Sequence, residues 1–136
     1  MSSPSYIFER NVELFERYYE VRKKEPQLTQ KEAIMKAIKS PTTRYWVSLN
    51  EVYREILNIV HGRELSVRIK SIRRKQIEDI YRNYLQLADK PTFKDCSVFF
   101  IVQFAISSPA PEFYLSFARA REIIRMIKRN YDVEEI

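Results

Sequence analysis

Hydrophobic residues recur three and four residues apart along most of the chain, which is the spacing of one face of an α-helix. The clearest segment runs from 49 to about 61 and has apolar residues at i, i+3, i+4, i+7, i+8 and i+11. Segments at about 6–24 and 117–131 have similar periods. A further segment, at about 66–88, is basic at first and becomes amphipathic toward its end. The pattern predicts a helix over each of the four.

Short polar residues predict where several helices begin. The spacing of a capping box, in which a hydroxyl and a carboxylate bond the N–H groups of the first turn, occurs three times. The three pairs are Thr29 with Glu32, Ser48 with Glu51, and Thr92 with Asp95. Ser116 predicts the cap of the last helix, and Gly62 predicts the end of the helix at 49–61.

The stretch "CSVFFIVQFAI" at 96–106 is ambiguous when it is taken alone. Its β-branched and aromatic residues are typical of a buried strand. A helix is also predicted at 29–38, where Thr29 is the cap and Ala33, Ile34, Ala37 and Ile38 form the apolar side. The position of 96–106 in an internal repeat makes it equivalent to this helix and favours a helix there too. Because it is hydrophobic on all sides, we expect it to be the central and most buried helix.

The internal repeat relates two parts of the chain 68 residues apart. Aligning 37–59 with 105–127 without gaps gives seven identities, among them the Ser-Pro pairs at 40–41 and 108–109. Further upstream, with a slip of two residues, Leu14 lies over Ile80 and Tyr18 over Tyr84. The matched positions are apolar or turn-forming, which is the pattern that an old duplication leaves. Chance similarity between two helical hairpins is the alternative.

These patterns together predict an all-α protein. Its sole glycine argues against hairpins and phosphate-cradling loops, and 45% apolar residues suffice for a core. We expect one domain over 1–136, with about six helices in two similar three-helix halves that share one core. The halves are approximately 6–62 and 66–131, followed by an acidic tail at 132–136. Each Ser-Pro connector is expected to set the angle between two helices.

The net charge of +6 is concentrated in two short segments. Residues 63–75 have six basic residues against one acidic residue, and residues 117–130 have five against one. Such runs are either solvated helix faces or contacts to a phosphate backbone. The candidate nucleic-acid-binding residues are Arg63, Arg68, Lys70, Arg73, Arg74, Lys75, Arg119, Arg121, Arg125 and Lys128.

Three helices whose last two meet at a fixed angle, in a basic chain, resemble helix-turn-helix DNA-binding modules. The resemblance covers about 29–60 and 92–130, as an apparent tandem duplication. It implies that the helices at 49–60 and 117–130 are the recognition elements. The side chains that would reach bases or phosphates are Asn50 and Arg54 in the first and Arg119, Arg121 and Arg125 in the second. Since Glu51 and Glu55 nearly cancel the charge of the first, only the second has the charge for this role.

Residue counts argue against several other classes of function. One histidine and one cysteine cannot form a multi-histidine or zinc-cluster site, and one glycine excludes GxSxG, Walker and GxGxxG patterns. We therefore expect no catalytic residue, cofactor or metal. The longest apolar run, 98–102, is far too short to span a bilayer. The first eleven residues have neither a basic nor an apolar segment, so we expect no secretion signal. With a lone cysteine, the cytoplasm is the expected location.

Three hypotheses about function remain open. The first is a small basic nucleic-acid-binding protein, acting on DNA in a regulatory or accessory role. The second is a helical module that uses exposed Tyr and Phe to bind a protein partner or a second copy of itself. An enzyme of unrecognised type is the third. Salt separates the first two, because phosphate contacts weaken as salt rises and apolar interfaces do not.

Overall fold

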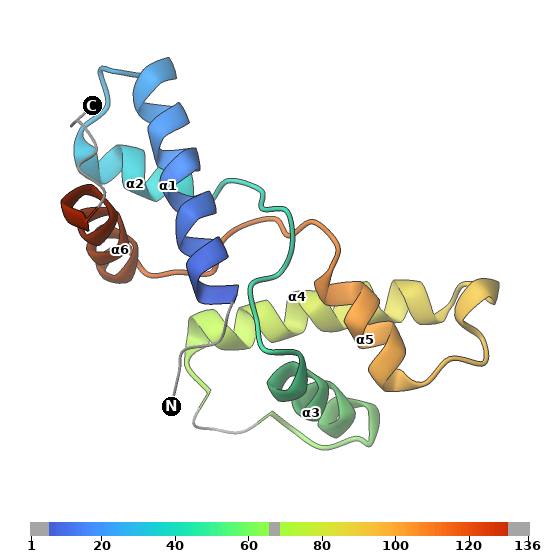
Figure 1. Ribbon diagram of the computed structural model, residues 1–136. Coiled ribbons are helices and arrows are strands. Elements are labelled where there is room, and N and C mark those ends of the chain that lie inside the picture. The colour runs from blue at the N-terminus through green and yellow to red at the C-terminus, as the bar shows by residue number, and fades with distance from the viewer. Residues whose placement is uncertain (1–5, 66–68, 131–136) are drawn as a thin grey trace. The chain divides into compact units, whose positions relative to one another are not determined.

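The structure is a computed structural model that describes residues 6–65 and 69–130. It is all-helical there, with no strand (Figure 1). The elements are α1 (Tyr6–Lys24), α2 (Gln30–Ile38), α3 (Leu49–Val60), α4 (Ser71–Ala88), the 3-10 helix η1 (Pro91–Phe93), α5 (Val98–Ile106) and α6 (Phe117–Asn130). The predicted all-α class and the six predicted helices are confirmed, including a helix rather than a strand in the ambiguous segment.

Helix α4 begins later than its sequence pattern predicts. Its first helical residue is Ser71, and Lys70 before it has an extended backbone with ψ 155°. A helix cannot pass through a residue in that conformation, so the predicted start at 66 is wrong. Ser66 itself lies outside the described residues.

The helix caps divide into those that form as predicted and those that do not. The Thr29 hydroxyl accepts a hydrogen bond from the Glu32 N–H at 3.1 Å, and the Glu32 carboxylate accepts one from the Thr29 N–H at 2.9 Å. The Ser116 hydroxyl caps α6 by accepting from the Arg119 N–H at 3.1 Å. Ser48 occupies the cap position of α3, but its side chain makes no capping hydrogen bond. The second predicted box is therefore wrong.

The third predicted box, at Thr92 and Asp95, is also wrong. Thr92 lies inside η1, where Pro91 occupies the first position of a short 3-10 turn. Helix α5 starts further on, with Ser97 as its cap accepting from the Phe100 N–H at 3.2 Å. The end of α3 is as predicted, since Gly62 has φ +77°. Its N–H donates to the Ile59 carbonyl at 2.9 Å, and the next N–H donates to Asn58 at 2.7 Å.

The chain divides into two compact units. Unit 1 comprises 1–42 and 111–136 and contains α1, α2 and α6, each of which packs against the other two. Unit 2 comprises 43–110 and contains α4, η1, α5 and α3, with α3 packed against both α4 and α5. The third helix of each sequence half thus packs with the first two helices of the other half. The halves at 6–62 and 66–131, and a single core for both, stay predictions.

Each unit has its own set of buried apolar residues. In unit 1 they include Leu14, Tyr18, Ala33, Ile34, Ala37, Ile38, Phe113, Ala120, Ile123, Ile124 and Ile127. In unit 2 they include Tyr45, Val47, Val52, Ile56, Ile77, Ile80, Ile101, Val102, Ala105 and Ile106. The buried positions of α2 and α5 correspond one to one at the offset of 68 residues.

An equivalent backbone hydrogen bond is made by each of the two connectors that follow the Ser-Pro pairs. In unit 2 the Tyr45 N–H donates to the Ile106 carbonyl at the end of α5, and in unit 1 the Phe113 N–H donates to the Ile38 carbonyl at the end of α2, both at 2.9 Å. Both donors and both acceptors are aligned pairs in the sequence repeat. Each connector is thus tied to the end of a helix in the unit that it enters.

The caps give a direct test of this structure. Thr29→Ala should lower the free energy of unfolding by about 1 kcal/mol, because the Glu32 N–H loses the hydroxyl that accepts its hydrogen bond. Ser48→Ala should change it by less than about 0.5 kcal/mol, because that hydroxyl makes no capping bond. Urea unfolding of both variants beside the wild type measures the difference. Equal losses at the two positions would contradict the cap geometry.

Candidate nucleic-acid interface

The candidate cations fall into the two units. Arg63, Lys70 and 73–75 belong to unit 2, whereas all the candidates from 117–130 belong to unit 1. Arg68 lies outside the described residues.

Arg73 in unit 2 is engaged by neighbouring side chains. One guanidinium nitrogen is 3.0 Å from a carboxylate oxygen of Glu51 on α3, and another donates to Gln76 at 3.0 Å. Gln76 is buried, which places this side of Arg73 against the protein. Its charge is thus largely balanced within unit 2.

Acidic residues also accompany Arg63 and Arg74. Arg63 donates to the Asn58 side chain at 3.1 Å. Both arginines line a cavity of about 400 Å³ that is also lined by Glu64 and Glu78. Lys70 and Lys75 are exposed. The basic segment 63–75 therefore forms a surface of mixed charge in its described part.

Helix α6 presents a different arrangement, because its residues advance by about 100° each. Ala120, Ile123, Ile124 and Ile127 form its buried face. Arg121, Arg125 and Lys128 have i, i+4, i+7 spacing and share one stripe beside that face. Arg125 is exposed to solvent. We call these three residues the α6 stripe.

Arg119 lies on the opposite flank of α6. Its guanidinium is 3.1 Å from the carboxylate of Glu122, the acidic residue of this helix. It is also near Arg10 of α1, a half-buried side chain that donates to Asn11 at 3.0 and 3.2 Å. Burial, and secondarily the charge of Arg119, lower the pKa of Arg10. Unit 1 therefore separates Arg119 from the α6 stripe.

Two aromatic rings adjoin the α6 stripe. The Arg121 guanidinium carbon lies 5.6 Å from the centre of the Phe117 ring, and the Lys31 ammonium of α2 lies 5.7 Å from the same ring. The Lys128 ammonium lies 5.2 Å from the centre of the Tyr18 ring. These distances are within the range of cation–π attraction. Packing of α2 against α6 thus adds Lys31 to the cations near the stripe.

Sequence reasoning missed Lys31 because it stands alone, next to Glu32 and far from either basic run. Its place beside Phe117 depends on the contact between α2 and α6, which are separated by most of the chain. No local signal in the sequence identifies it.

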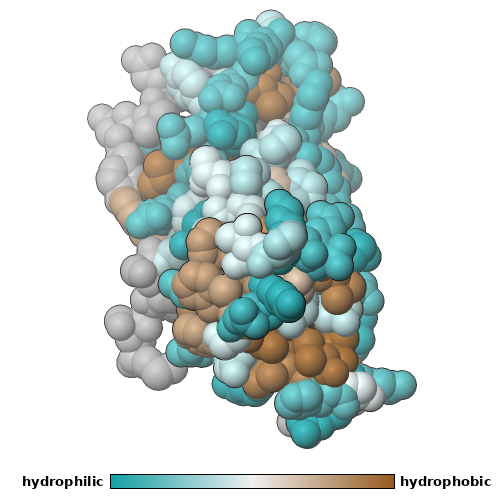
Figure 2. Space-filling view, turned by 90° about the vertical axis from the view of Figure 1, so that its right-hand side faces the viewer, coloured by the Kyte–Doolittle hydropathy of each residue, from teal (hydrophilic) through white to brown (hydrophobic). Residues whose placement is uncertain are grey.

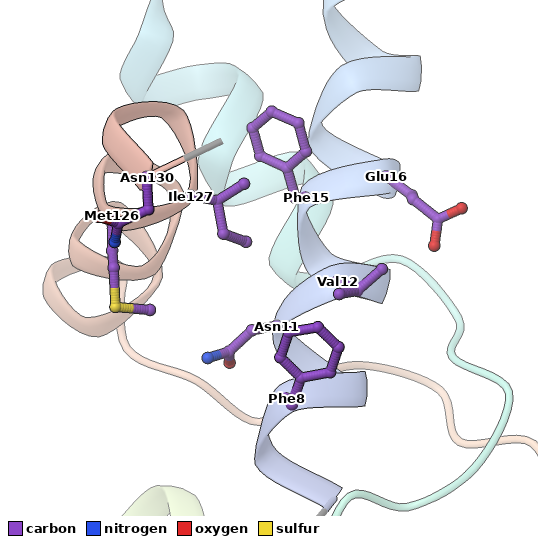
Figure 3. Close-up of a pocket in the computed structure, with 8 residues that line it drawn as sticks. All are labelled: Phe8, Asn11, Val12, Phe15, Glu16, Met126, Ile127 and Asn130. Carbon is purple, nitrogen blue, oxygen red and sulfur yellow. The ribbon is translucent and has the colours of Figure 1, made fainter. Parts of the chain in front are cut away.

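The flank of α6 that lies opposite the α6 stripe borders an apolar groove of about 360 Å³ in unit 1 (Figure 3). Phe8, Val12 and Phe15 line it from α1, and Met126 and Ile127 line it from α6. Asn11, Glu16 and Asn130 complete the lining. At the corresponding positions of α4, unit 2 has Arg74, Glu78 and Tyr81, which line the cavity of mixed charge. The same place in the fold is therefore apolar in one unit and charged in the other.

No described helix combines the length and the hydrophobicity that crossing a bilayer requires. The described residues contain no group of three or more His, Cys, Asp and Glu side chains placed to hold a metal ion. Comparison of the chain with protein-family models, curated proteins and solved structures gives no match in any of the three.

The different surroundings of Arg125 and Arg73 can be measured chemically. Under limited modification with phenylglyoxal, exposed Arg125 should react several times faster than Arg73, whose guanidinium is held by Glu51 and Gln76. Peptide mass spectrometry over time gives both rates in one sample. The Glu51→Gln variant should raise the rate at Arg73 and leave Arg125 unchanged. Equal rates in the wild type would contradict the structure.

Proposed function

We propose that the protein binds nucleic acid through phosphate contacts made by Arg121, Arg125 and Lys128, with Lys31 beside them. The observation that carries this proposal is the placement of three cations on one stripe of α6, while Glu122 pairs with Arg119 on the far flank. Clustered cations on one helix face form the electrostatic footprint of a nucleic-acid binder.

The dimensions of the α6 stripe suit a polyanion. Lys128 is seven positions after Arg121, and at 1.5 Å per residue the two lie about 10 Å apart along the helix. The phosphates of one DNA strand follow one another at about 3.4 Å along the duplex axis. The stripe thus extends over about three nucleotides. Arg121 also stands beside Phe117, a ring that offers a stacking surface at the edge of the stripe.

The surroundings of the charged side chains also distinguish the two helices that the helix-turn-helix resemblance assigns to recognition, α3 and α6. Helix α6 is the contacting element, because its single carboxylate pairs with Arg119 and three other cations share one stripe. Helix α3 is the structural counterpart, because Arg54 lines a pocket with Glu51, Glu55 and Arg73. We propose a regulatory or accessory role on DNA, without a catalytic step, in the cytoplasm, where a lone cysteine such as Cys96 stays reduced.

Salt titration with matched variants tests the proposal. A short duplex DNA and the single strand of the same sequence, both fluorescently labelled, are titrated between about 50 and 200 mM salt. Each phosphate contact contributes about 0.9 to the slope of log affinity against log salt. Arg121→Gln/Arg125→Gln should therefore weaken binding at least tenfold at low salt and reduce the slope by about 2.

Arg119→Gln is the matched control, because it removes an arginine from the same helix on the flank away from the stripe. It should leave the slope within about 0.3 of the wild-type value. The proposal fails if the wild type binds neither probe at low salt. It also fails if the control weakens binding as much, per charge removed, as the double variant does.

A further inference from the structure

The outward face of α5 in unit 2 is aromatic. Phe99, Phe100 and Phe104 are 38, 43 and 48% exposed. Phe100 and Phe104 contact each other and Phe93 of η1, with ring centres 5.1–6.4 Å apart, and Phe99 meets Tyr53 of α3 edge-on at 5.0 Å. Figure 2 shows hydrophobic surface gathered in its lower part, where α5 lies. Four of the nine residues of α5 are buried, the same number as in nine-residue α2, and the rest of this helix, apolar on all sides in sequence, faces solvent.

Helix α2 provides an internal control for this face. Its buried residues Ala33, Ile34, Ala37 and Ile38 match Ile101, Val102, Ala105 and Ile106 of α5 position by position. The outward positions differ. Where α5 has three phenylalanines, α2 has Lys31, Glu32 and Lys36, all exposed to solvent. A helix in this place of the fold thus packs with a charged outer face.

The three phenylalanines pack in part on Phe93 and Tyr53, yet 38–48% of each stays exposed, which is unfavourable in water. Each exposed apolar ring gains about 25 cal/mol per Å² when a partner covers it. Contiguous apolar surface of this kind marks interaction sites on folded proteins. The question is which partner covers it.

We propose that a second copy of this chain covers the α5 face in a twofold-symmetric contact. Residues 96–108 contain no charged residue. Two copies, each with a net charge of +6, can therefore meet there without repulsion between like charges at the centre of the contact. Around Phe93 the exposed rim has two residues of each sign, Asp89, Lys90, Lys94 and Asp95. A rim with equal numbers of both signs can complement itself across a twofold axis.

The size of the face predicts a weak dimer. A stable pair of proteins buries about 800 Å² on each partner, whereas this face consists of one nine-residue helix and a 3-10 turn. We therefore expect association in the range of about 10 μM to about 1 mM. The proposal is independent of nucleic-acid binding, because the α6 stripe belongs to unit 1 and the α5 face to unit 2.

Sedimentation of the nucleic-acid-free wild type over this concentration range tests the proposal. The mass should rise from that of a monomer toward that of a dimer, and raising the salt concentration should not reverse it. In Phe100→Glu/Phe104→Lys, the two rings are replaced by the residues that α2 has at these positions, and the association constant should fall at least tenfold. This variant should still fold, because Glu at position 100 completes a capping box with Ser97.

Phe8→Arg is the matched control. It replaces an exposed ring of unit 1, 61% exposed, by the residue at the corresponding position of α4, and it should associate like the wild type. If the wild type stays monomeric up to about 1 mM, a different partner covers the face and the proposal is overturned. Equal association by the double variant, or loss of association in Phe8→Arg alone, also overturns it.

A cross-linking assay keeps the native aromatic face and does not depend on the double variant. In a Cys96→Ser background, Gln103→Cys places a thiol among the phenylalanines of α5, and Gln86→Cys places one on exposed α4. A disulfide needs Cα atoms closer than about 7 Å. Oxidation should produce a covalent dimer faster in the Gln103→Cys variant. Equal rates in the two variants would contradict the twofold contact.

Discussion

Burial of Ala120, Ile123, Ile124 and Ile127 against α1 and α2 determines where every other side chain of α6 lies. Covering one isoleucine side chain contributes about 1.5–3 kcal/mol, so this face of the helix cannot rotate outward without a large loss of stability. With it fixed, the helical period places Arg121, Arg125 and Lys128 on one side and Arg119 on the other. The hydrogen bond from Phe113 to Ile38 ties the preceding connector to α2 and sets where α6 enters. The positions of the charged side chains of α6 are thus a consequence of apolar packing in unit 1.

The two units share their interior design and differ in their surfaces. Equivalent N-caps, Thr29 and Ser97, accept equivalent hydrogen bonds, and equivalent serines, Ser40 and Ser108, donate to the carbonyls four residues earlier. Outside the core, unit 1 is charged where unit 2 has the phenylalanines of α5, and it is apolar where unit 2 has Arg74 and Glu78. Packing constrains the buried positions in both units, whereas the outer positions are free to vary. We therefore locate function where the units differ.

Counting charges along the sequence overstates the cationic character of 63–75. Two of its arginines share a cavity with Glu64 and Glu78, and Arg73 is paired with Glu51, which precedes it by 22 residues. In 117–130 the single carboxylate, Glu122, pairs with the arginine that the helical period has already separated from the others. Two segments of similar charge per residue therefore have different electrostatic surfaces. Only the surroundings of each side chain distinguish them.

The sequence alone determined the number and order of the six helices, the cap at Thr29, the cap at Ser116 and the stop at Gly62. Each of these depends on residues within a few positions of one another, and hydrophobic spacing and capping are local interactions. Only the tertiary structure decided that α3 packs with α4 and α5, that α6 packs with α1 and α2, and that Lys31 reaches Phe117. It also decided that Glu51 pairs with Arg73 instead of completing a cap, and that half of α5 faces solvent. These outcomes depend on contacts between residues far apart in the chain, for which no local pattern carries a signal.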